Sequence, residues 1–249
     1  MTNVASVPDV DANALPSLEG RVVAIAGAGG NLGPTVVQRL AASGARLALG
    51  GRSKDSLDEL TTDLGAEADT AAVDLLDAGS ARAWADGIAE RLGGVDALVH
   101  LVGGWRGGQP VEEAPLEDWD ALQALLVRTT QHATQAFASH LMASEKGRFA
   151  IVSSGQARAP TSKNAAYAAA KAAQEAWTLA LADRFRGTGA TANIVVVGSI
   201  LTPAMREESP EKDFSTFTPA EEIADALAYL CSDAAASMNG QRLTLRGAR

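Results

Sequence analysis

The chain has 249 residues, of which 47% are hydrophobic and 20% are charged, so it has enough apolar material for a large core. Acidic residues outnumber basic ones by 30 to 21, with a formal net charge of -9, and this balance excludes the basic surface that nucleic-acid binding needs. The single Cys231 excludes an internal disulfide, and three histidines without metal-ligand spacing argue against a metal centre.

Residues 1–17 contain Asp, Asn, Pro and Val without hydrophobic periodicity, and we expect a flexible N-terminal leader there. The leader lacks the basic and apolar regions of a signal peptide. Apolar runs elsewhere are far shorter than the roughly 20 residues of a membrane helix. We therefore expect a cytoplasmic protein without a membrane partner.

From residue 18 onward, β-branched apolar runs alternate with longer segments of helical period, a pattern that predicts βαβ units around a buried parallel sheet. The candidate strands are residues 21–26, 45–50, 70–73, 97–102, 148–153, 192–197 and 242–245. The candidate helices are residues 32–43, 53–64, 78–92, 116–143, 164–186 and 219–231. Right-handed crossovers place helices on both faces, so we predict one Rossmann-like, doubly wound α/β domain over residues 18–249 with a seven-stranded parallel sheet.

A glycine-rich stretch, residues 27–33 (Gly-Ala-Gly-Gly-Asn-Leu-Gly), joins the first strand to the first helix. Glycine lets the backbone approach a pyrophosphate, and a helix N-terminus attracts the anion. Leu32 breaks the strict G-x-G-x-x-G spacing, so a merely flexible turn is the alternative interpretation. The strand–turn–helix context favours a dinucleotide site. Its candidate cofactor-binding residues are Gly27, Gly30, Asn31, Leu32 and Gly33.

The second strand is followed by Arg52 and Ser53, without an acidic residue. A carboxylate there would accept a hydrogen bond from the ribose 2′-hydroxyl, whereas arginine pairs with a 2′-phosphate. These two residues therefore favour NADP over NAD, unless Arg52 is simply solvated at the helix start. Asp74 and Leu75 follow the third strand and are candidates to approach the adenine, although Asp74 fits the N-cap of a turn equally well.

Tyr167 and Lys171 are one turn apart on the same face of the helix predicted over residues 164–186. A nearby ammonium favours the phenolate, which makes tyrosine usable as an acid or base near neutral pH. Such a pair also occurs by chance on alanine-rich helix surfaces. Ser153 and Ser154 at the end of the fifth strand favour the catalytic interpretation of the pair, because a hydroxyl there can hydrogen-bond a substrate oxygen.

With this glycine loop and Tyr-x-x-x-Lys spacing, the chain resembles the short-chain dehydrogenase/reductase family over residues 18–245. The resemblance selects Ser154, which stands thirteen residues before Tyr167. It implies that Tyr167 donates a proton to a carbonyl oxygen as hydride arrives from a nicotinamide, that Lys171 holds the ribose and that Ser154 orients the substrate. The further cofactor contacts that it implies are Val102, Gly103, Ile200 and Thr202.

Some positions depart from the family pattern. Ala26 and Asn31 replace Thr and Gly of the glycine fingerprint, and residues 100–103 read His-Leu-Val-Gly instead of Asn-Asn-Ala-Gly. Leu126 stands where the family has an asparagine that holds a proton-relay water, which leucine cannot do. Thr130, one turn away, is a candidate substitute or else a buried or interface residue.

Three loops, residues 103–115, 155–163 and 200–218, reach the expected substrate side, and we interpret the last as a mobile lid. They carry Trp105, Arg106, Gln156 and Arg158, which predict a flat or anionic substrate unless both arginines face solvent. The resemblance and the small residues of the helix over 164–186 predict a homotetramer, with a dimer as the alternative.

The expected function is that of an NAD(P)-dependent oxidoreductase, an NADPH-dependent reductase of ketones or 3-oxo groups acting on a small-molecule carbonyl or alcohol. Leu126 and the altered segment over 100–103 leave a second interpretation open, a dinucleotide-binding regulatory or structural protein with little turnover. A third is an isomerase or dehydratase that uses the same tyrosine as a base. The fold alone does not decide between them.

Overall fold

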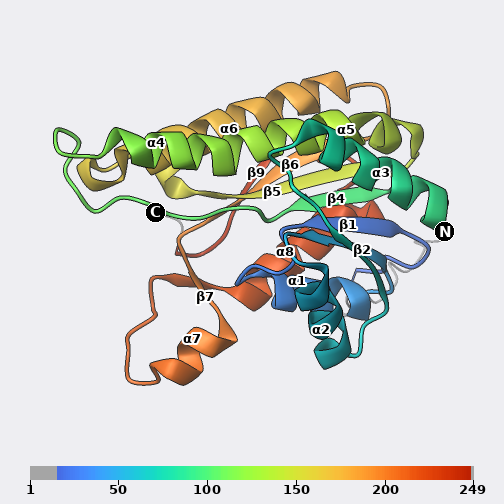
Figure 1. Cartoon of the computed structure of the whole chain (residues 1–249), viewed down its shortest axis with the longest axis horizontal. Helices are drawn as coiled ribbons and strands as arrows, with labels where there is room; N and C mark the ends of the chain where they lie inside the picture. Colours follow the sequence, from blue (N-terminus) through green and yellow to red (C-terminus); the bar gives the residue numbers. More distant parts are fainter. Residues whose placement is uncertain (1–15, 248–249) are drawn as a thin grey trace, which may run out of the picture.

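The structure, a computed structural model, describes residues 16–247, so the predicted leader lies outside the described residues except for Pro16 and Ser17. Seven parallel strands form one sheet in the order β3-β2-β1-β4-β5-β6-β9 (Figure 1). The strand order reverses between β1 and β4, as in doubly wound folds. The predicted Rossmann-like α/β architecture is confirmed.

The elements follow the predicted alternation of strands and helices. The strands of the sheet are β1 (Val22–Ala26), β2 (Arg46–Gly51), β3 (Ala68–Ala72), β4 (Ala97–His100), β5 (Arg148–Ser154), β6 (Thr191–Val197) and β9 (Arg242–Thr244). The helices are α1 (Gly33–Ala42), α2 (Lys54–Leu64), α3 (Ala78–Leu92), α4 (Leu116–Leu122), α5 (Thr129–Ala143), α6 (Ala165–Arg184) and α8 (Ala220–Cys231). Short helical turns lie at η2 (Gly155–Ala157), η3 (Ser162–Asn164) and η4 (Asp233–Ala235).

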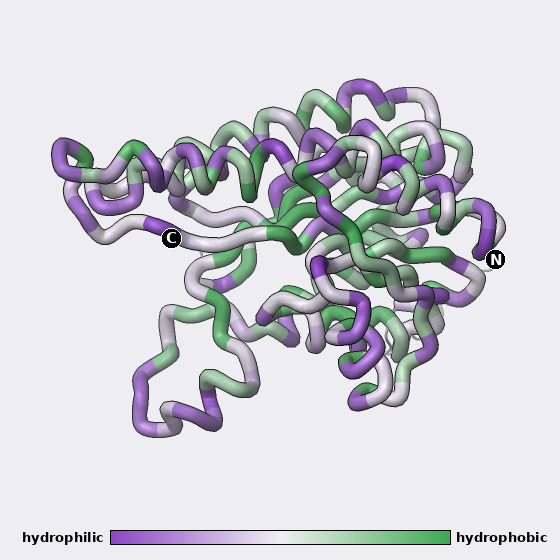
Figure 2. Tube along the Cα trace, viewed as in Figure 1, coloured by the Kyte–Doolittle hydropathy of each residue, from purple (hydrophilic) through white to green (hydrophobic). Residues whose placement is uncertain are grey.

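Two hydrophobic cores lie on opposite faces of the sheet. Helices α1, α2 and α8 cover one face, and α3, α5 and α6 cover the other (Figure 1). Successive side chains of a strand point to opposite faces, so Val23 and Ile25 join the first core whereas Ala24 joins the second. Figure 2 shows the apolar residues concentrated in these central strands. Burial on both faces explains why the strands read as continuous apolar runs.

Most predicted boundaries are shifted by one or two residues, and the differences in β3, β4 and the helix predicted over 116–143 have identifiable causes. Strand β3 begins two residues before the predicted 70–73, and β4 ends at His100 and not at residue 102. The predicted helix over 116–143 is interrupted by a π-helical segment, η1 (Gln123–Arg128), in which Thr129 N–H bonds the Ala124 carbonyl. Hydrophobic periodicity does not register this expansion, because one wide turn shifts the apolar stripe only slightly.

The segment predicted as a lid, residues 200–218, contains short elements that the sequence did not indicate. Strands β7 (Ser199–Leu201) and β8 (Phe217–Pro219) pair in parallel as a separate two-stranded sheet, with helix α7 (Pro203–Glu208) between them. Figure 1 shows this unit projecting away from the main sheet. Strands β7 and β8 have three residues each and β8 ends in a proline, so no strand pattern is apparent there, in contrast to the equally short but predicted β9.

Among the described residues, none of the helices combines the length and the apolar character that crossing a bilayer requires. Within residues 16–247, no group of three or more His, Cys, Asp or Glu side chains is placed to hold a metal ion.

Candidate active site

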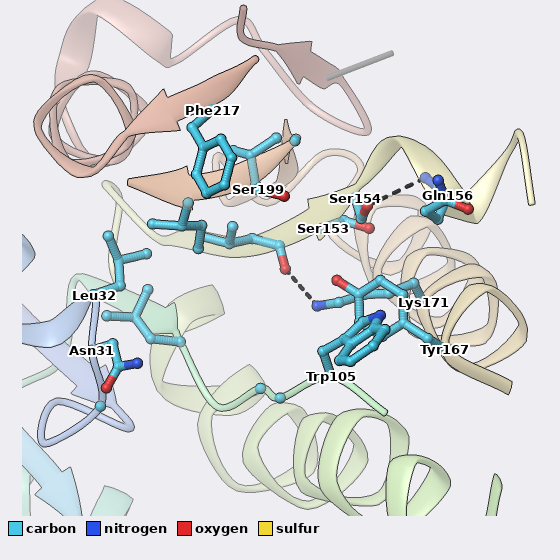
Figure 3. A pocket seen from close by; sticks show the side chains of 18 of the residues that line it. Asn31, Leu32, Trp105, Ser153, Ser154, Gln156, Tyr167, Lys171, Ser199 and Phe217 are labelled. Atoms are coloured by element: carbon cyan, nitrogen blue, oxygen red, sulfur yellow. Dashed lines mark hydrogen bonds between the residues drawn. The ribbon is translucent and has the colours of Figure 1, made fainter. Parts of the chain in front are cut away.

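A cavity of about 840 Å³ opens at the carboxyl ends of β1, β4, β5 and β6. Its wall is built from the glycine loop after β1, the segment after β4, the end of β5, the first turns of α6 and the β7–β8 unit. This is the crevice in which open α/β sheets bind their ligands. Figure 3 shows side chains from these separate segments pointing into one space.

The glycine loop is packed too closely for larger residues at two positions. A Cβ on Gly33 would lie 1.7 Å from the Ala28 carbonyl oxygen, and Gly27 has a φ of +80° with the Val102 backbone 3.0 Å from the Cβ position. In the described part of the chain, α1 begins without a side-chain cap and without an acidic residue in its first turn. Its positive end is therefore free to face an anion, and this loop fits a pyrophosphate.

Three predicted catalytic side chains line the same cavity. Ser154 is the last residue of β5, while Tyr167 and Lys171 lie on successive turns of α6 (Figure 3). Burial raises the pKa of Tyr167, and the nearby Ser154 hydroxyl acts in the opposite direction. The structure thus brings the three groups together, while their roles stay predictions.

Lys171 is almost completely buried, at 6% exposure. Its Nζ donates to the Val152 carbonyl at 2.8 Å and to Gln174 Oε1 at 3.0 Å. Burial lowers the pKa of Lys171 from 10.5 to about 8, and the Glu175 carboxylate opposes this shift. An ammonium has three N–H donors, so one remains for a ligand in the cavity.

Behind Lys171 lies a buried polar cluster that the sequence did not predict. Glu175 Oε1 accepts hydrogen bonds from Ser153 Oγ at 2.6 Å and from Arg242 Nη2 at 3.0 Å. Gln174 and Glu175 follow Lys171 by three and four residues, so they share its helix face. That spacing could have indicated that the two side chains lie near Lys171, but it does not predict which strand they contact.

His100 and Leu126 are buried behind the cavity and are not among its described lining residues. His100 is 1% exposed; its Nε2 lies 3.3 Å from Thr129 Oγ1, and its Nδ1 has no partner among the described residues. Burial, together with the Lys171 charge, lowers the pKa of His100 from 6.5 to about 3. Leu126 is fully buried in η1, and its Cδ2 lies 3.7 Å from the Cβ position of Gly103. Both side chains are therefore uncharged near pH 7.

The predicted cofactor residues fall into two groups. Those that line the cavity are Gly27, Gly30, Asn31, Leu32, Gly33, Val102, Gly103, Ile200 and also Tyr167 and Lys171, which were predicted to contact the cofactor as well. Those that lie outside its lining are Arg52, Ser53, Asp74, Leu75 and Thr202.

The second group occupies local positions that the structure defines. Arg52 is exposed directly after β2, and Ser53 caps α2 by accepting from the Ser56 N–H. Asp74 Oδ1 accepts from the Leu76 N–H, the turn interpretation, while Leu75 is buried. Thr202 caps α7. Contact of these residues with a cofactor stays a prediction.

The substrate side of the cavity has aromatic and amide walls. Trp105 Nε1 donates to Asn164 Oδ1 at 3.0 Å, which fixes the indole beside Tyr167, and Gln156, Met205 and Phe217 also line the space (Figure 3). Neither predicted arginine is among the described lining residues. Arg106 lies 3.4 Å from Asp118, and Arg158 is exposed.

The comparisons with known proteins agree in class. The family model described as short chain dehydrogenase matches residues 21–213. D-threitol dehydrogenase from Mycolicibacterium smegmatis is 30% identical over 242 residues, covering 92% of this chain and 93% of the relative. Gluconate 5-dehydrogenase from Gluconobacter oxydans is 30% identical over 244 residues, covering 93% and 95%. The structure of a gluconate 5-dehydrogenase from Burkholderia cenocepacia, in complex with NADP and tartrate, has a TM-score of 0.82 at 27% identity and covers 93% of this chain and 95% of that one.

Proposed function

Because this chain belongs to the short-chain dehydrogenase family and is an oxidoreductase, we propose that it transfers hydride between a nicotinamide cofactor and a carbonyl or alcohol substrate. The observation that carries the proposal is the convergence of Ser154, Tyr167 and Lys171 on one cavity that also contains the glycine loop. A bare Rossmann-like fold would support binding alone. A phenol, a hydroxyl and a buried ammonium beside the dinucleotide loop support proton transfer coupled to redox chemistry.

The side chains divide the work by their chemistry. When bound, the cofactor supplies or accepts the hydride at the substrate carbon. In reduction, the Tyr167 hydroxyl donates its proton to the carbonyl oxygen, while the Ser154 hydroxyl donates a hydrogen bond to that same oxygen; in oxidation, the Tyr167 phenolate takes the hydroxyl proton. Burial raises the pKa of Tyr167, and a cation in the same cavity, such as the Lys171 ammonium, favours the phenolate.

We also propose NADP as the preferred cofactor, with NAD as the alternative. Arg52 is exposed after β2, and an acidic residue is missing from the end of that strand, so a 2′-phosphate meets a cation there. The similar gluconate 5-dehydrogenase structure contains NADP. This preference supports ketone or 3-oxo-group reduction as the physiological direction.

The cavity favours a flat, neutral substrate over an anionic one. Trp105 and Phe217 supply aromatic faces, and Gln156 supplies a neutral amide. Arg106 is engaged by Asp118 and Arg158 lies outside the lining, so the two candidate anion partners are not placed for that role. We therefore propose neutral cyclic ketones and their alcohols as the substrate class.

A turnover assay with matched tyrosine variants tests the function. NADPH and NADH absorbance is followed with a panel of cyclic ketones, quinones and carboxylated analogues for the wild type, Tyr167→Phe, Tyr229→Phe and Arg52→Ala. Tyr229 is the other tyrosine of the chain and lies on α8, away from the cavity. Tyr167→Phe should lose about 10²–10⁴-fold in kcat, while Tyr229→Phe keeps wild-type turnover. Arg52→Ala should raise the KM for NADPH about tenfold and leave that for NADH unchanged.

Two results would contradict the proposal. Retained turnover in Tyr167→Phe would remove the assigned acid, and NADPH binding without turnover of any substrate would favour a regulatory protein.

A further inference from the structure

The surroundings of Lys171 include a hydrogen-bonded connection to a neighbouring helix. Gln174 accepts from Lys171 Nζ through Oε1 at 3.0 Å and donates through Nε2 to Thr130 Oγ1 on α5 at 2.9 Å. Thr130 Oγ1 in turn donates to the Leu126 carbonyl in η1 at 2.7 Å. We call the two bonds of Gln174 the Gln174 bridge. All four residues are buried, with Thr130 and Leu126 at 0% exposure.

The direction of every bond in the bridge is determined. A hydroxyl has one hydrogen, and Thr130 uses it on the Leu126 carbonyl, so Thr130 can only accept from Gln174. The NH₂ group of Gln174 must therefore face Thr130, and its oxygen must face Lys171. An ammonium can only donate, so the amide cannot turn over without leaving two donors opposed.

The Gln174 bridge uses the main chain of Leu126, whose side chain is apolar, to support Lys171. The Leu126 side chain packs with Leu122, Val127 and Ala170, so only its main-chain carbonyl is available for polar contact. That carbonyl supports Thr130 and, through it, Gln174. The α5–α6 contact thus supports the ammonium through protein groups.

We propose that Gln174 is a positioning residue that holds the Lys171 ammonium at the cavity wall, with Thr130 fixing the orientation of its amide. The kinetic consequence rests on the proposed function, whereas the effect on Lys171 itself does not. The bridge leaves the third N–H of Lys171 available to a ligand in the cavity that Lys171 lines, because the other two are bound by Val152 and Gln174.

Other charged and titratable groups around Lys171 have different partners. Glu175, on the same helix, is bound by Ser153 and by Arg242 from β9. His100 from β4 is neutral near pH 7, because burial keeps its pKa at about 3. Tyr167 is protonated without a ligand, since burial raises its pKa. Gln174 is therefore the side chain that directly accepts from the ammonium.

The first experiment measures Lys171 without turnover. The chain has five lysines, so ¹³Cε-lysine NMR of the ligand-free protein gives a simple spectrum in which Lys171→Met assigns the signal. Wild-type Lys171 should titrate near pH 8. Gln174→Leu should lower that midpoint by about one pH unit, because a bond to the charged form is lost. Gln174→Glu should raise it, since a carboxylate still accepts and adds opposite charge.

Thr130→Val and Thr134→Val form a matched pair. Both remove a buried hydroxyl from α5. The Thr134 hydroxyl accepts from Trp177 Nε1 and donates to the main-chain carbonyls of Thr130 and Gln131, so it makes no bond to Gln174. Thr130→Val should lower the Lys171 midpoint, and Thr134→Val should leave it unchanged. An unmoved midpoint in folded Gln174→Leu, or equal shifts in both threonine variants, overturns the proposal. Should Gln174→Leu not fold, the opposite shift in Gln174→Glu and the threonine pair decide.

The second experiment follows alcohol oxidation against pH. Oxidation needs the Tyr167 phenolate, which the Lys171 charge stabilises, so loss of the bridge should move the acidic limb of kcat to higher pH. We expect Gln174→Leu to lower kcat about tenfold with the substrate KM unchanged, and Gln174→Glu to restore the limb. A raised KM with an unmoved limb overturns the positioning role. If no substrate is turned over, the NMR titration still decides the inference.

Discussion

His100 of β4 and Lys171 of α6 are both buried, and burial lowers the pKa of both. The two residues differ in the hydrogen-bond partners of their side-chain nitrogens. Lys171 has two acceptors and remains mostly protonated at pH 7, whereas His100 Nδ1 has no partner within residues 16–247. A second cation beside Lys171 would be repelled, so the His100 imidazole is neutral near pH 7. This asymmetry keeps one positive charge at the site.

Replacing His100 tests this assignment through the pH dependence of stability. Between pH 6.5 and about 3, the unfolded histidine binds a proton that the folded one does not, so stability falls as the pH decreases. The slope is about 1.4 kcal/mol per pH unit. Lys171 is protonated in both states below pH 7 and does not contribute there.

Urea unfolding at pH 7 and pH 5 provides the measurement. The wild type should lose about 2 kcal/mol more than His100→Gln on acidification, over the part of the interval below pH 6.5. Each protein is compared only with itself, which cancels the packing cost of the substitution. An identical loss in both proteins would show that His100 accepts a proton in the folded state.

At the scale of elements, the segment α4-η1-α5 supports the site by apolar packing and by its main chain. The hydroxyls of Thr129 and Thr130 donate hydrogen bonds to the main-chain carbonyls of Leu125 and Leu126, four residues earlier. Such bonds accompany local distortions of a helix. The wide turn places Leu126 against Ala170 of α6, although no residue of 116–143 is among the described lining residues of the cavity.

Leu126→Asn is therefore expected to destabilise the protein and not to improve catalysis. The asparagine would bury an amide in an apolar cluster, and the adjacent carbonyl is already bound by Thr130. A buried polar group without a partner costs about 1–3 kcal/mol, in addition to lost apolar contact. Denaturant unfolding and kcat/KM measure the two effects. Higher kcat/KM in Leu126→Asn would mean that the site lacks a polar group that the Gln174 bridge does not replace.

The strength of the local signal decided which elements the sequence predicted. Strand β1 is a fully buried apolar run before glycines, and its limits were predicted to within one residue. Strand β3 reads Ala-Asp-Thr-Ala-Ala at the sheet edge and is only partly buried, so its pattern is weak. The π-helical turn and the short strands β7 and β8 leave no periodic signature.

The same distinction holds within the site. Ser154, Tyr167 and Lys171 were found because their spacing is local or matches a family pattern. Gln174 and Thr130 lie 44 residues apart in sequence and meet only when α5 packs against α6. Their bond depends on tertiary contact, which periodicity does not contain.

At the scale of the whole molecule, the cavity needs almost the entire described chain. Its lining runs from Gly27 to Gly247. A Cβ on Gly198, after β6, would lie 2.1 Å from the Gly247 carbonyl oxygen, so Gly247 packs directly against the segment after β6, and both residues line the cavity. Arg242 of β9 also reaches Glu175 of α6. These long-range contacts support our proposal that residues 18–249 act as one catalytic domain.

The outer face of α5 and α6 provides the surface on which we propose that two copies of this chain pair within a homotetramer. A shallow, mostly apolar groove there is lined by Thr134, Gln135, Ala138, Trp177, Ala180 and Leu181. Small side chains allow close helix approach, and a chain with a net charge of -9 associates most readily through an uncharged face. Light scattering after size exclusion should give the mass of four copies.

Ala138→Glu and Ala180→Glu should each reduce the mass to that of a dimer or monomer, because they bury a carboxylate in the paired groove without a partner. Ala42→Glu serves as the control, since Ala42 is exposed on α1, on the opposite face of the sheet. It should leave the mass unchanged. A monomeric wild type, or groove variants with the wild-type mass, would exclude this face as the interface. Turnover by a monomeric variant would further show that the cavity is complete within one copy.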